Sequence, residues 1–247
     1  MLRLLIPLMT VISLLPNETW AERITVAVAS NFLTTARDIT AIFEAETGHD
    51  VDLVHGSTGK LFAQIVAGAP FDIYLAADDE RPARLVERGM AEGGQTYHYA
   101  TGHLALIHRD TLEPGTIDDI LIRPGLRVAL ADPEVAPYGK AAREVLRGLR
   151  GGSWEIGLVK GESVGQAFAF VATGNADAGL IALSQVLTYE GEIWALEVDP
   201  VLHEPIRQDA VILPRAENSE AAQEFISFLL GEKAAEILLN TGYELPQ

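Results

Sequence analysis

Segments typical of strands and of helices alternate three times in the first third of this 247-residue chain. The strand-like segments are short and rich in β-branched or small apolar residues, whereas the helix-like segments repeat apolar residues with a period near 3.6. Strands at residues 24–29, 51–54 and 71–76 are expected to alternate with helices that end near residues 47 and 67 and begin near residue 79. Such alternation with short joins is typical of an α/β fold, in which a mostly parallel sheet is flanked by helices.

The same alternation restarts after a long extended segment at residues 96–108, and a second extended segment at residues 206–213 precedes two final helices. Two α/β units joined by two extended crossings predict a two-lobed clamshell whose last helices return to the first lobe. We expect lobe 1 at residues 22–101 and 207–247, and lobe 2 at residues 102–206. The later elements are expected to be strands at residues 127–131, 156–160 and 179–183, and helices ending near residue 149 and at 166–172, 219–230 and 233–239.

The amino terminus has the composition of a cleaved secretory signal. Arg3 is followed by an apolar run at residues 4–15 and by a small residue, Ala21, which is the pattern that signal peptidases recognise. The run is too short to cross a membrane as a helix. From this pattern we expect residues 1–21 to be removed. The chain has no cysteine for disulfides or for a lipid anchor, so we expect the exported product to be periplasmic.

The formal net charge of −17 constrains the partners. So acidic a chain is repelled by nucleic acids and by anionic membrane surfaces, and its charge mainly favours solubility.

His98, His103 and His108 are five residues apart on an extended segment, so neighbouring rings face opposite sides. The sequence therefore predicts no nucleic-acid partner and no site for a metal cation.

The turn between the second strand and its helix is the first candidate site. Ser57 is expected to be the N-cap and to satisfy one free amide, while Gly56 and Gly59 let the backbone approach a bound group. Free amides and the positive end of the helix dipole make such a turn an anion site. Two alternatives remain: Ser57 only caps its helix, or Ser57 and Lys60 form the S-x-x-K motif of a serine hydrolase. No Ser-Asp-Asn or Lys-Thr-Gly motif accompanies that second possibility.

Polar residues at the ends of other strands extend this candidate site. In open α/β sheets, ligands bind beyond the carboxyl ends of the strands, where helix amino termini converge. Ser30 and Asn31 follow the first strand, and Tyr138 and Val164 lie near two helix starts of the second lobe. In a two-lobed protein these positions face the cleft between the lobes.

Six segments carry a resemblance to a known family. They read VASNF at 28–32, GSTGKL at 56–61, AGAPFDIYLAAD at 67–78, YHYATGHLAL at 97–106, DPEVAPYG at 132–139 and GESVGQ at 161–166. Together they resemble the periplasmic molybdate-binding proteins of ABC importers, over nearly the whole exported chain. The resemblance implies a type II solute-binding fold that closes on molybdate or tungstate and delivers it to an inner-membrane permease. It also implies a monomer with no cofactor and no catalytic activity.

The resemblance implies oxyanion contacts at Ser30 or Asn31, Ser57, Tyr138 and Val164, the last through its backbone amide. Some family members place a tyrosine in the late strand-to-helix turn, where this chain has Ala182-Leu183-Ser184. Tyr138 is expected to take over that donor role, and the contribution of Ser184 stays open.

The candidate residues hold no carboxylate. A carboxylate repels a fully ionised oxyanion but accepts a hydrogen bond from a protonated one. Its absence favours molybdate, tungstate or sulfate over phosphate. The alternatives to the molybdate reading are thus a receptor for sulfate or another tetrahedral oxyanion with the same fold, and the hydrolase that uses Ser57 and Lys60.

Overall fold

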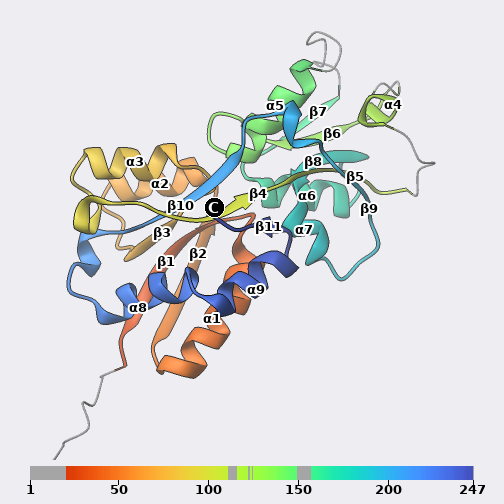
Figure 1. Cartoon of the computed structure of the whole chain (residues 1–247). Coiled ribbons are helices and arrows are strands. Elements are labelled where there is room, and N and C mark those ends of the chain that lie inside the picture. Colours follow the sequence, from red (N-terminus) through yellow and green to blue (C-terminus); the bar gives the residue numbers. More distant parts are fainter. Residues whose placement is uncertain (1–20, 111–115, 122, 124, 149–156, 247) are drawn as a thin grey trace, which may run out of the picture.

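The computed structural model describes residues 21–110, 116–121, 123, 125–148 and 157–246. The predicted signal peptide lies outside these residues, apart from its last position. The described chain forms two sheets, each flanked by helices (Figure 1). This confirms the α/β fold with two lobes that the sequence predicts. Among the described helices, none is long and apolar enough to cross a bilayer.

The first sheet contains six strands in the order β11-β4-β10-β3-β1-β2. β1 pairs in parallel with both β2 and β3, whereas β10 is antiparallel to β3 and β4, and β11 is antiparallel to β4. Hence β10 and β11 run opposite to the other strands. The strands are β1 (Arg23–Ala29), β2 (Asp50–Gly56), β3 (Ile73–Leu75), β4 (Tyr97–Gly102), β10 (Ile206–Ile212) and β11 (Tyr243–Glu244).

Helices cover both faces of this sheet (Figure 1). The helices are α1 (Leu33–Thr47), α2 (Thr58–Val66), α3 (Glu80–Glu87), α8 (Glu220–Leu229) and α9 (Glu232–Asn240). α1, α8 and α9 pack together on one face, and α2 packs beside α3 on the other. The apolar residues Ala36, Ile39 and Phe43, spaced by three and four along α1, are buried. Gly48 ends α1 with a φ of 78°, the left-handed conformation that glycine adopts most readily at a helix C-terminus.

The second sheet contains five strands in the order β7-β6-β8-β5-β9. β6 pairs in parallel with β7 and β8, and β5 is antiparallel to β8 and β9. The strands are β5 (Leu104–His108), β6 (Val128–Ala131), β7 (Leu158–Gly161), β8 (Ala178–Ala182) and β9 (Trp194–Glu197). The helices are α4 (Ile117–Leu121), α5 (Pro137–Gly148), α6 (Val164–Ala172) and α7 (Leu183–Leu187), and short 3₁₀ turns lie at η1 (Glu92–Gly94), η3 (Pro200–Leu202) and η4 (Pro214–Ala216).

The chain crosses between the sheets at the two extended segments that the sequence marks as crossings. It leaves the first sheet at Gly102 and enters the second at Leu104, and it returns at Ile206, which pairs with Gly102. The expected extended segment at 96–108 is therefore two strands, Tyr97–Gly102 and Leu104–His108, separated by His103. The division of the chain into two separate lobes near residues 102 and 206 stays a prediction.

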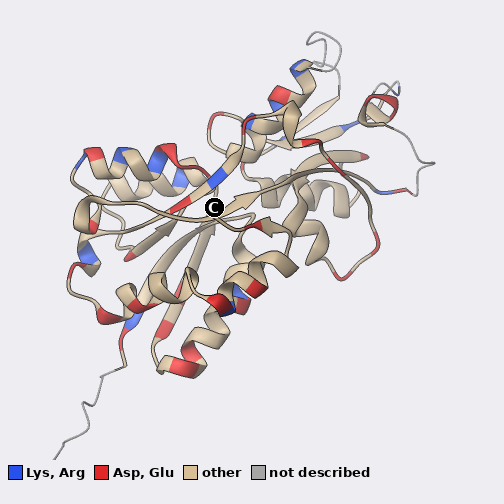
Figure 2. Ribbon diagram, in the orientation of Figure 1, with Lys and Arg blue, Asp and Glu red and all other residues tan. Residues whose placement is uncertain are grey.

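Some elements differ from the expectation. α6 begins at Val164 rather than at residue 166, and β3 is shorter than the expected strand at 71–76. α7, β9 and β11 carried no clear periodicity and were not predicted. β9 pairs with β5, β11 pairs with β4, and α7 packs against β8, so tertiary contacts determine these elements. Acidic side chains are spread over both parts of the molecule, and basic side chains lie along α3 (Figure 2).

Candidate functional site

A small pocket lies where the two sheets face each other. Its cavity volume is about 10 Å³, so the two sheets leave little free space here. Its lining comes from both sheets and from the first residues of α2, α5 and α6: Ala29, Ser30, Asn31, Ser57, Thr58, Ala77, Ala136, Pro137, Tyr138 and Val164. All five residues predicted from the sequence are among these ten, although up to 134 positions separate them along the chain.

Ser57 occupies the N-cap position of α2 but does not cap it. Its backbone is extended (φ −71°, ψ 145°), as at an N-cap, yet its side chain accepts no hydrogen bond from the helix. The prediction that its hydroxyl satisfies a helix amide is therefore wrong. The side chain is only 3% exposed, and its Oγ has no hydrogen-bond partner within the described residues. A buried hydroxyl without a partner costs free energy, so Oγ is free to bind a group that enters the pocket.

Lys60 is held away from Ser57. Its Nζ lies 2.6 Å from Glu162 across the gap between the lobes, and Ser57 Oγ contacts no base in the described chain. A nucleophilic serine needs a base within hydrogen-bond reach. The geometry thus gives no support to the hydrolase alternative.

Ser30 contacts the first turn of α6, which begins at Val164, across the pocket. Ser30 donates its amide hydrogen to Gly56 O at 2.9 Å, and its Oγ accepts a hydrogen bond from the Gly165 amide at 3.2 Å. Val164 is the first residue of α6 and is 3% exposed, and Ser163 caps this helix by accepting from the Gln166 amide. The Val164 amide belongs to the first turn, which has no intrahelical acceptor. It is therefore suited to donate to an anion.

Asn31 uses its side chain inside the protein. Its Nδ2 donates to Gln208 Oε1 at 2.9 Å and to the Tyr243 hydroxyl at 3.1 Å. Its carbonyl oxygen accepts from Ser184 Oγ at 3.2 Å. Both amide hydrogens are thus occupied, so any contact of Asn31 with an anion comes from its main chain.

Ser184 lies behind Asn31 and does not line the pocket. Its Oγ accepts a hydrogen bond from the Tyr243 hydroxyl at 2.9 Å. Sequence reasoning missed Tyr243 and Gln208, the two residues that tie this network together. Neither lies at a strand-to-helix turn, so no local pattern distinguishes them from core residues.

Tyr138 is 1% exposed and lies in the first turn of α5. Burial raises the pKa of its hydroxyl well above the usual value of 10.0, because the phenolate form would lose its hydration. The hydroxyl therefore keeps its hydrogen at neutral pH. Its oxygen lies 3.4 Å from Gln208 Nε2, which donates to it.

None of the ten lining residues is ionisable at neutral pH. The positive ends of α2 and α6 reach the pocket together with that of α5. Hydroxyls and free first-turn amides can therefore stabilise a small anion without a cation. In the described residues, no three His, Asp or Glu side chains are arranged to hold a metal ion.

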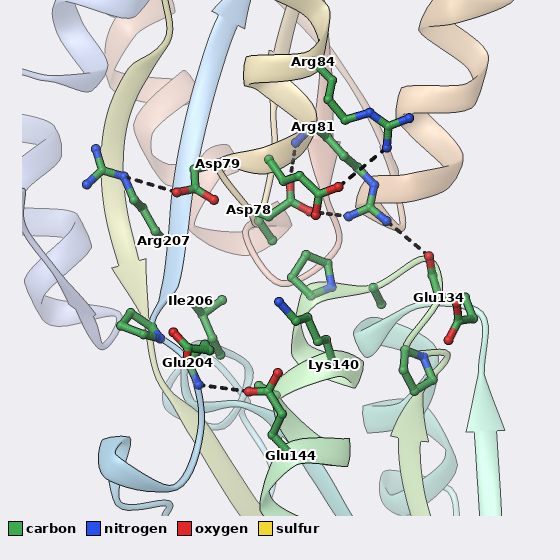
Figure 3. Close-up of a pocket in the computed structure, with 17 residues that line it drawn as sticks. Asp78, Asp79, Arg81, Arg84, Glu134, Lys140, Glu144, Glu204, Ile206 and Arg207 are labelled. Carbon is green, nitrogen blue, oxygen red and sulfur yellow. Dashed lines mark hydrogen bonds and ion pairs between the residues drawn. The ribbon is translucent and has the colours of Figure 1, made fainter.

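A charged hollow of about 340 Å³ flanks the small pocket, on the side of α3 and β10 (Figure 3). Asp78 and Asp79 from one sheet and Glu134 and Glu144 from the other are among its acidic residues. Burial raises the pKa of Asp78, although the adjacent Arg81 lowers it. Asp78 Oδ1 also accepts from the Arg81 amide at 3.1 Å, which supports the helix-start role expected from sequence. Six acidic and four basic side chains line this hollow, and the acidic excess makes it a poor site for a dianion.

The two sides are in direct contact around the small pocket. The Gly59 amide donates to Val135 O at 2.8 Å, and Arg81 Nη2 donates to Glu134 O at 3.2 Å. A Cβ added to Gly59 would lie 2.9 Å from Val135 Cα and 3.0 Å from Val135 O. The structure is thus closed over the pocket, and closure depends on the missing side chain of Gly59.

Comparisons with known proteins show the family of this chain. The profile of a family described as bacterial extracellular solute-binding protein matches residues 24–244. The chain is 42% identical over 230 residues to the molybdate-binding protein of Rhodobacter capsulatus, covering 90% of this chain and 88% of that protein. It is also 42% identical over 237 residues to the molybdate-binding protein of Azotobacter vinelandii, covering 91% of each.

Among solved structures, the fold is similar to the periplasmic molybdate-binding protein of Azotobacter vinelandii. The TM-score is 0.82, with 36% sequence identity, and the match covers 91% of this chain and 100% of that one. The residues that the family profile matches, 24–244, include every residue that lines the small pocket.

Proposed function

This chain belongs to the bacterial extracellular solute-binding protein family, and from that premise we propose that it binds molybdate or tungstate and delivers it to the permease of an ABC importer. The observation that carries the proposal is the pocket between the sheets. It gathers Ser30, Asn31, Ser57, Tyr138 and Val164 without any charged group. The relatives in Rhodobacter and Azotobacter that share 42% of their residues with this chain are molybdate-binding proteins, which supports the choice of ion.

The donors in the pocket suit a fully ionised tetrahedral oxyanion. The Ser57 and Tyr138 hydroxyls can donate from their side chains, and the amides of Asn31, Thr58 and Val164 lie at or near helix starts. Each hydrogen bond to a charged group contributes about 1.5–3 kcal/mol. Several such bonds, made in a site shielded from water, are enough for tight binding without a salt bridge.

Closure of the two lobes makes the complex recognisable to a permease. The contacts of Gly59 with Val135 and of Lys60 with Glu162 form only when the lobes meet. An ion that bridges the lobes binds the closed form better than an open form, and it therefore shifts the population towards closure. We further propose that the protein acts as a monomer after removal of residues 1–21 and carries out no chemical reaction on the ion.

Isothermal titration of residues 22–247 with molybdate, tungstate, sulfate and phosphate tests the function. We expect one-to-one binding of molybdate and tungstate at least about 100-fold tighter than that of sulfate, because each mispositioned hydrogen bond to a charged group costs about 1.5–3 kcal/mol. Phosphate should bind more weakly still, since it carries a proton at neutral pH.

Tight binding of sulfate with no response to molybdate would retain the binding mechanism but make the protein a sulfate receptor. The absence of binding for all four ions would overturn the proposal.

A further inference from the structure

Gln208 connects the predicted ligand residues to the strand on which the chain returns to the first sheet. Its side chain is fully buried, at 0% exposed. It lies on β10 beside an irregularity in the pairing with β4, between Gln208 and Asp209. Oε1 of Gln208 is 2.9 Å from Asn31 Nδ2 and 3.1 Å from the Tyr99 hydroxyl, and Nε2 is 3.4 Å from the Tyr138 oxygen.

The directions of these hydrogen bonds are mutually consistent. Asn31 Nδ2, which only donates, faces Gln208 Oε1, which accepts. The amide nitrogen of Gln208 then faces Tyr138, and the Tyr138 oxygen accepts. A tyrosine hydroxyl has a single hydrogen, and that hydrogen is left for a partner elsewhere.

Gly102 places the two groups together. A Cβ at this position would overlap the Tyr138 hydroxyl oxygen and lie 2.6 Å from Gln208 Nε2. Both polar groups therefore rest directly on the backbone of Gly102, the last residue before the first crossing between the sheets. Glycine is required at position 102 because the side chains of Tyr138 and Gln208 pack directly against its backbone.

We propose that Gln208 is a positioning residue that makes the Tyr138 hydroxyl a donor towards the bound oxyanion. By occupying the acceptor side of the Tyr138 oxygen, Gln208 turns the hydroxyl hydrogen into the pocket. The same side chain holds Asn31 through Oε1, so one residue of β10 orients a pocket residue from each lobe. A site with this polarity favours an oxyanion that bears no proton. This inference rests on the proposed oxyanion-binding function.

A double-mutant cycle tests the inference. Molybdate affinity is measured by isothermal titration for the wild type, Tyr138→Phe, Gln208→Met, Gln208→Glu and each Gln208 variant combined with Tyr138→Phe. Gln208→Met removes the donor at similar volume. Gln208→Glu replaces the donor by an acceptor, which takes the Tyr138 hydrogen away from the ion.

We expect Tyr138→Phe to weaken binding roughly tenfold or more in the wild type, because it removes a hydrogen bond to a charged group. In the Gln208→Glu background it should weaken binding less than twofold, since the hydroxyl no longer points at the ion. Gln208→Met should give an intermediate value. Non-additivity of this kind reports coupling between the two side chains, whereas a general loss of packing would not produce it.

The same loss from Tyr138→Phe in every background would overturn the inference, as would an equal or higher molybdate affinity for Gln208→Glu. The thermal melting temperature of each variant confirms folding, and the Gln208→Met arm completes a cycle if the buried glutamate prevents folding. The wild-type titration separates the two proposals: if the wild type binds no oxyanion, the proposed function fails, and if it binds while the cycle is additive, only the role of Gln208 fails.

Discussion

At the scale of single residues, Ser57 shows how a position can look like a cap and serve another purpose. A serine at the start of a helix ordinarily accepts a hydrogen bond from a first-turn amide, as Ser163 and Ser219 do here. Ser57 instead keeps a buried Oγ in the pocket that has no partner among the residues the structure describes. This unsatisfied hydroxyl lowers the free energy of unfolding unless an ion occupies the site.

Ser57→Ala should therefore separate stability from binding. Because no cap is lost, the free energy of unfolding without ligand should change by less than about 0.5 kcal/mol, whereas loss of a real cap costs about 1 kcal/mol. The molybdate affinity should fall roughly tenfold or more. Urea unfolding and isothermal titration measure the two quantities.

Ser219→Ala is the matched control, because Ser219 Oγ accepts from the Ala222 amide at the start of α8, away from the pocket. It should lose stability and keep its affinity. A Ser57→Ala variant that loses stability while binding molybdate normally would show that Ser57 is only a structural residue.

At the scale of elements, the first turn of α2 and the turn before α5 contact each other through backbone atoms. The hydrogen bond from the Gly59 amide to Val135 O leaves no room for a side chain at residue 59. Since the opposing atoms are mostly backbone, they cannot move aside as a flexible side chain would.

Gly59→Ala should consequently disfavour the closed form without unfolding either lobe. Overpacking of a tight contact costs about 1–3 kcal/mol, or roughly five- to hundredfold in affinity. Molybdate titration gives the affinity, and small-angle X-ray scattering with and without molybdate gives the extent of closure.

Gly148→Ala is the control for this variant, because a Cβ there meets nothing within 4 Å. It should bind and close as the wild type does. Unchanged affinity of Gly59→Ala would mean that the ion is bound without the contact between these two turns.

The turns around the pocket were largely predictable, and the polar network behind them was not. Ser30, Ser57, Tyr138 and Val164 follow or begin regular elements, so the rule for open α/β sheets locates them. Gln208 lies within a strand, and its 177-residue separation from Asn31 leaves no local signal. Only the pairing of β10 between β3 and β4 brings it beneath Asn31.

At the scale of the whole molecule, the two sheets share a set of buried tyrosines near their junction. Tyr74, Tyr99, Tyr138 and Tyr243 are each 3% exposed or less. Burial raises the pKa of each hydroxyl above 10.0, to about 12 for Tyr243 and well above 10.0 for the other three. The folded protein therefore retains protons that the unfolded chain releases above pH 10.

The stability of the protein should decline as the pH rises above 10. Below pH 10 both states keep the hydroxyl protons, so these groups cause no pH dependence there. Between pH 10 and about 12, only the unfolded state ionises, and each such group lowers the free energy of unfolding by about 1.4 kcal/mol per pH unit. Urea unfolding at intervals from pH 8.5 to 11.5 would detect this slope.

Tyr74→Phe removes one of these groups outside the pocket and should reduce the slope above pH 10 by about one quarter. The exposed Tyr189→Phe, with a residue 38% exposed, serves as the control for removal of a hydroxyl at the surface. A stability that is flat to pH 11.5 would contradict the assignment of these tyrosines as protonated in the folded state.

The amino-acid sequence by itself determined the class of fold, the two crossings and the turns that carry the candidate ligands. Local periodicity, capping residues and turn glycines act over a few neighbouring positions, so these features are encoded where they occur. Only the tertiary structure decided that Ser57 leaves its helix uncapped, that Asn31 spends both amide hydrogens inside the protein, and that Gln208 and Gly102 set the direction of the Tyr138 hydroxyl. The Asn31 and Tyr138 contacts join residues at least 70 positions apart, and the burial of Ser57 Oγ without a partner is likewise known only once the sheets have packed.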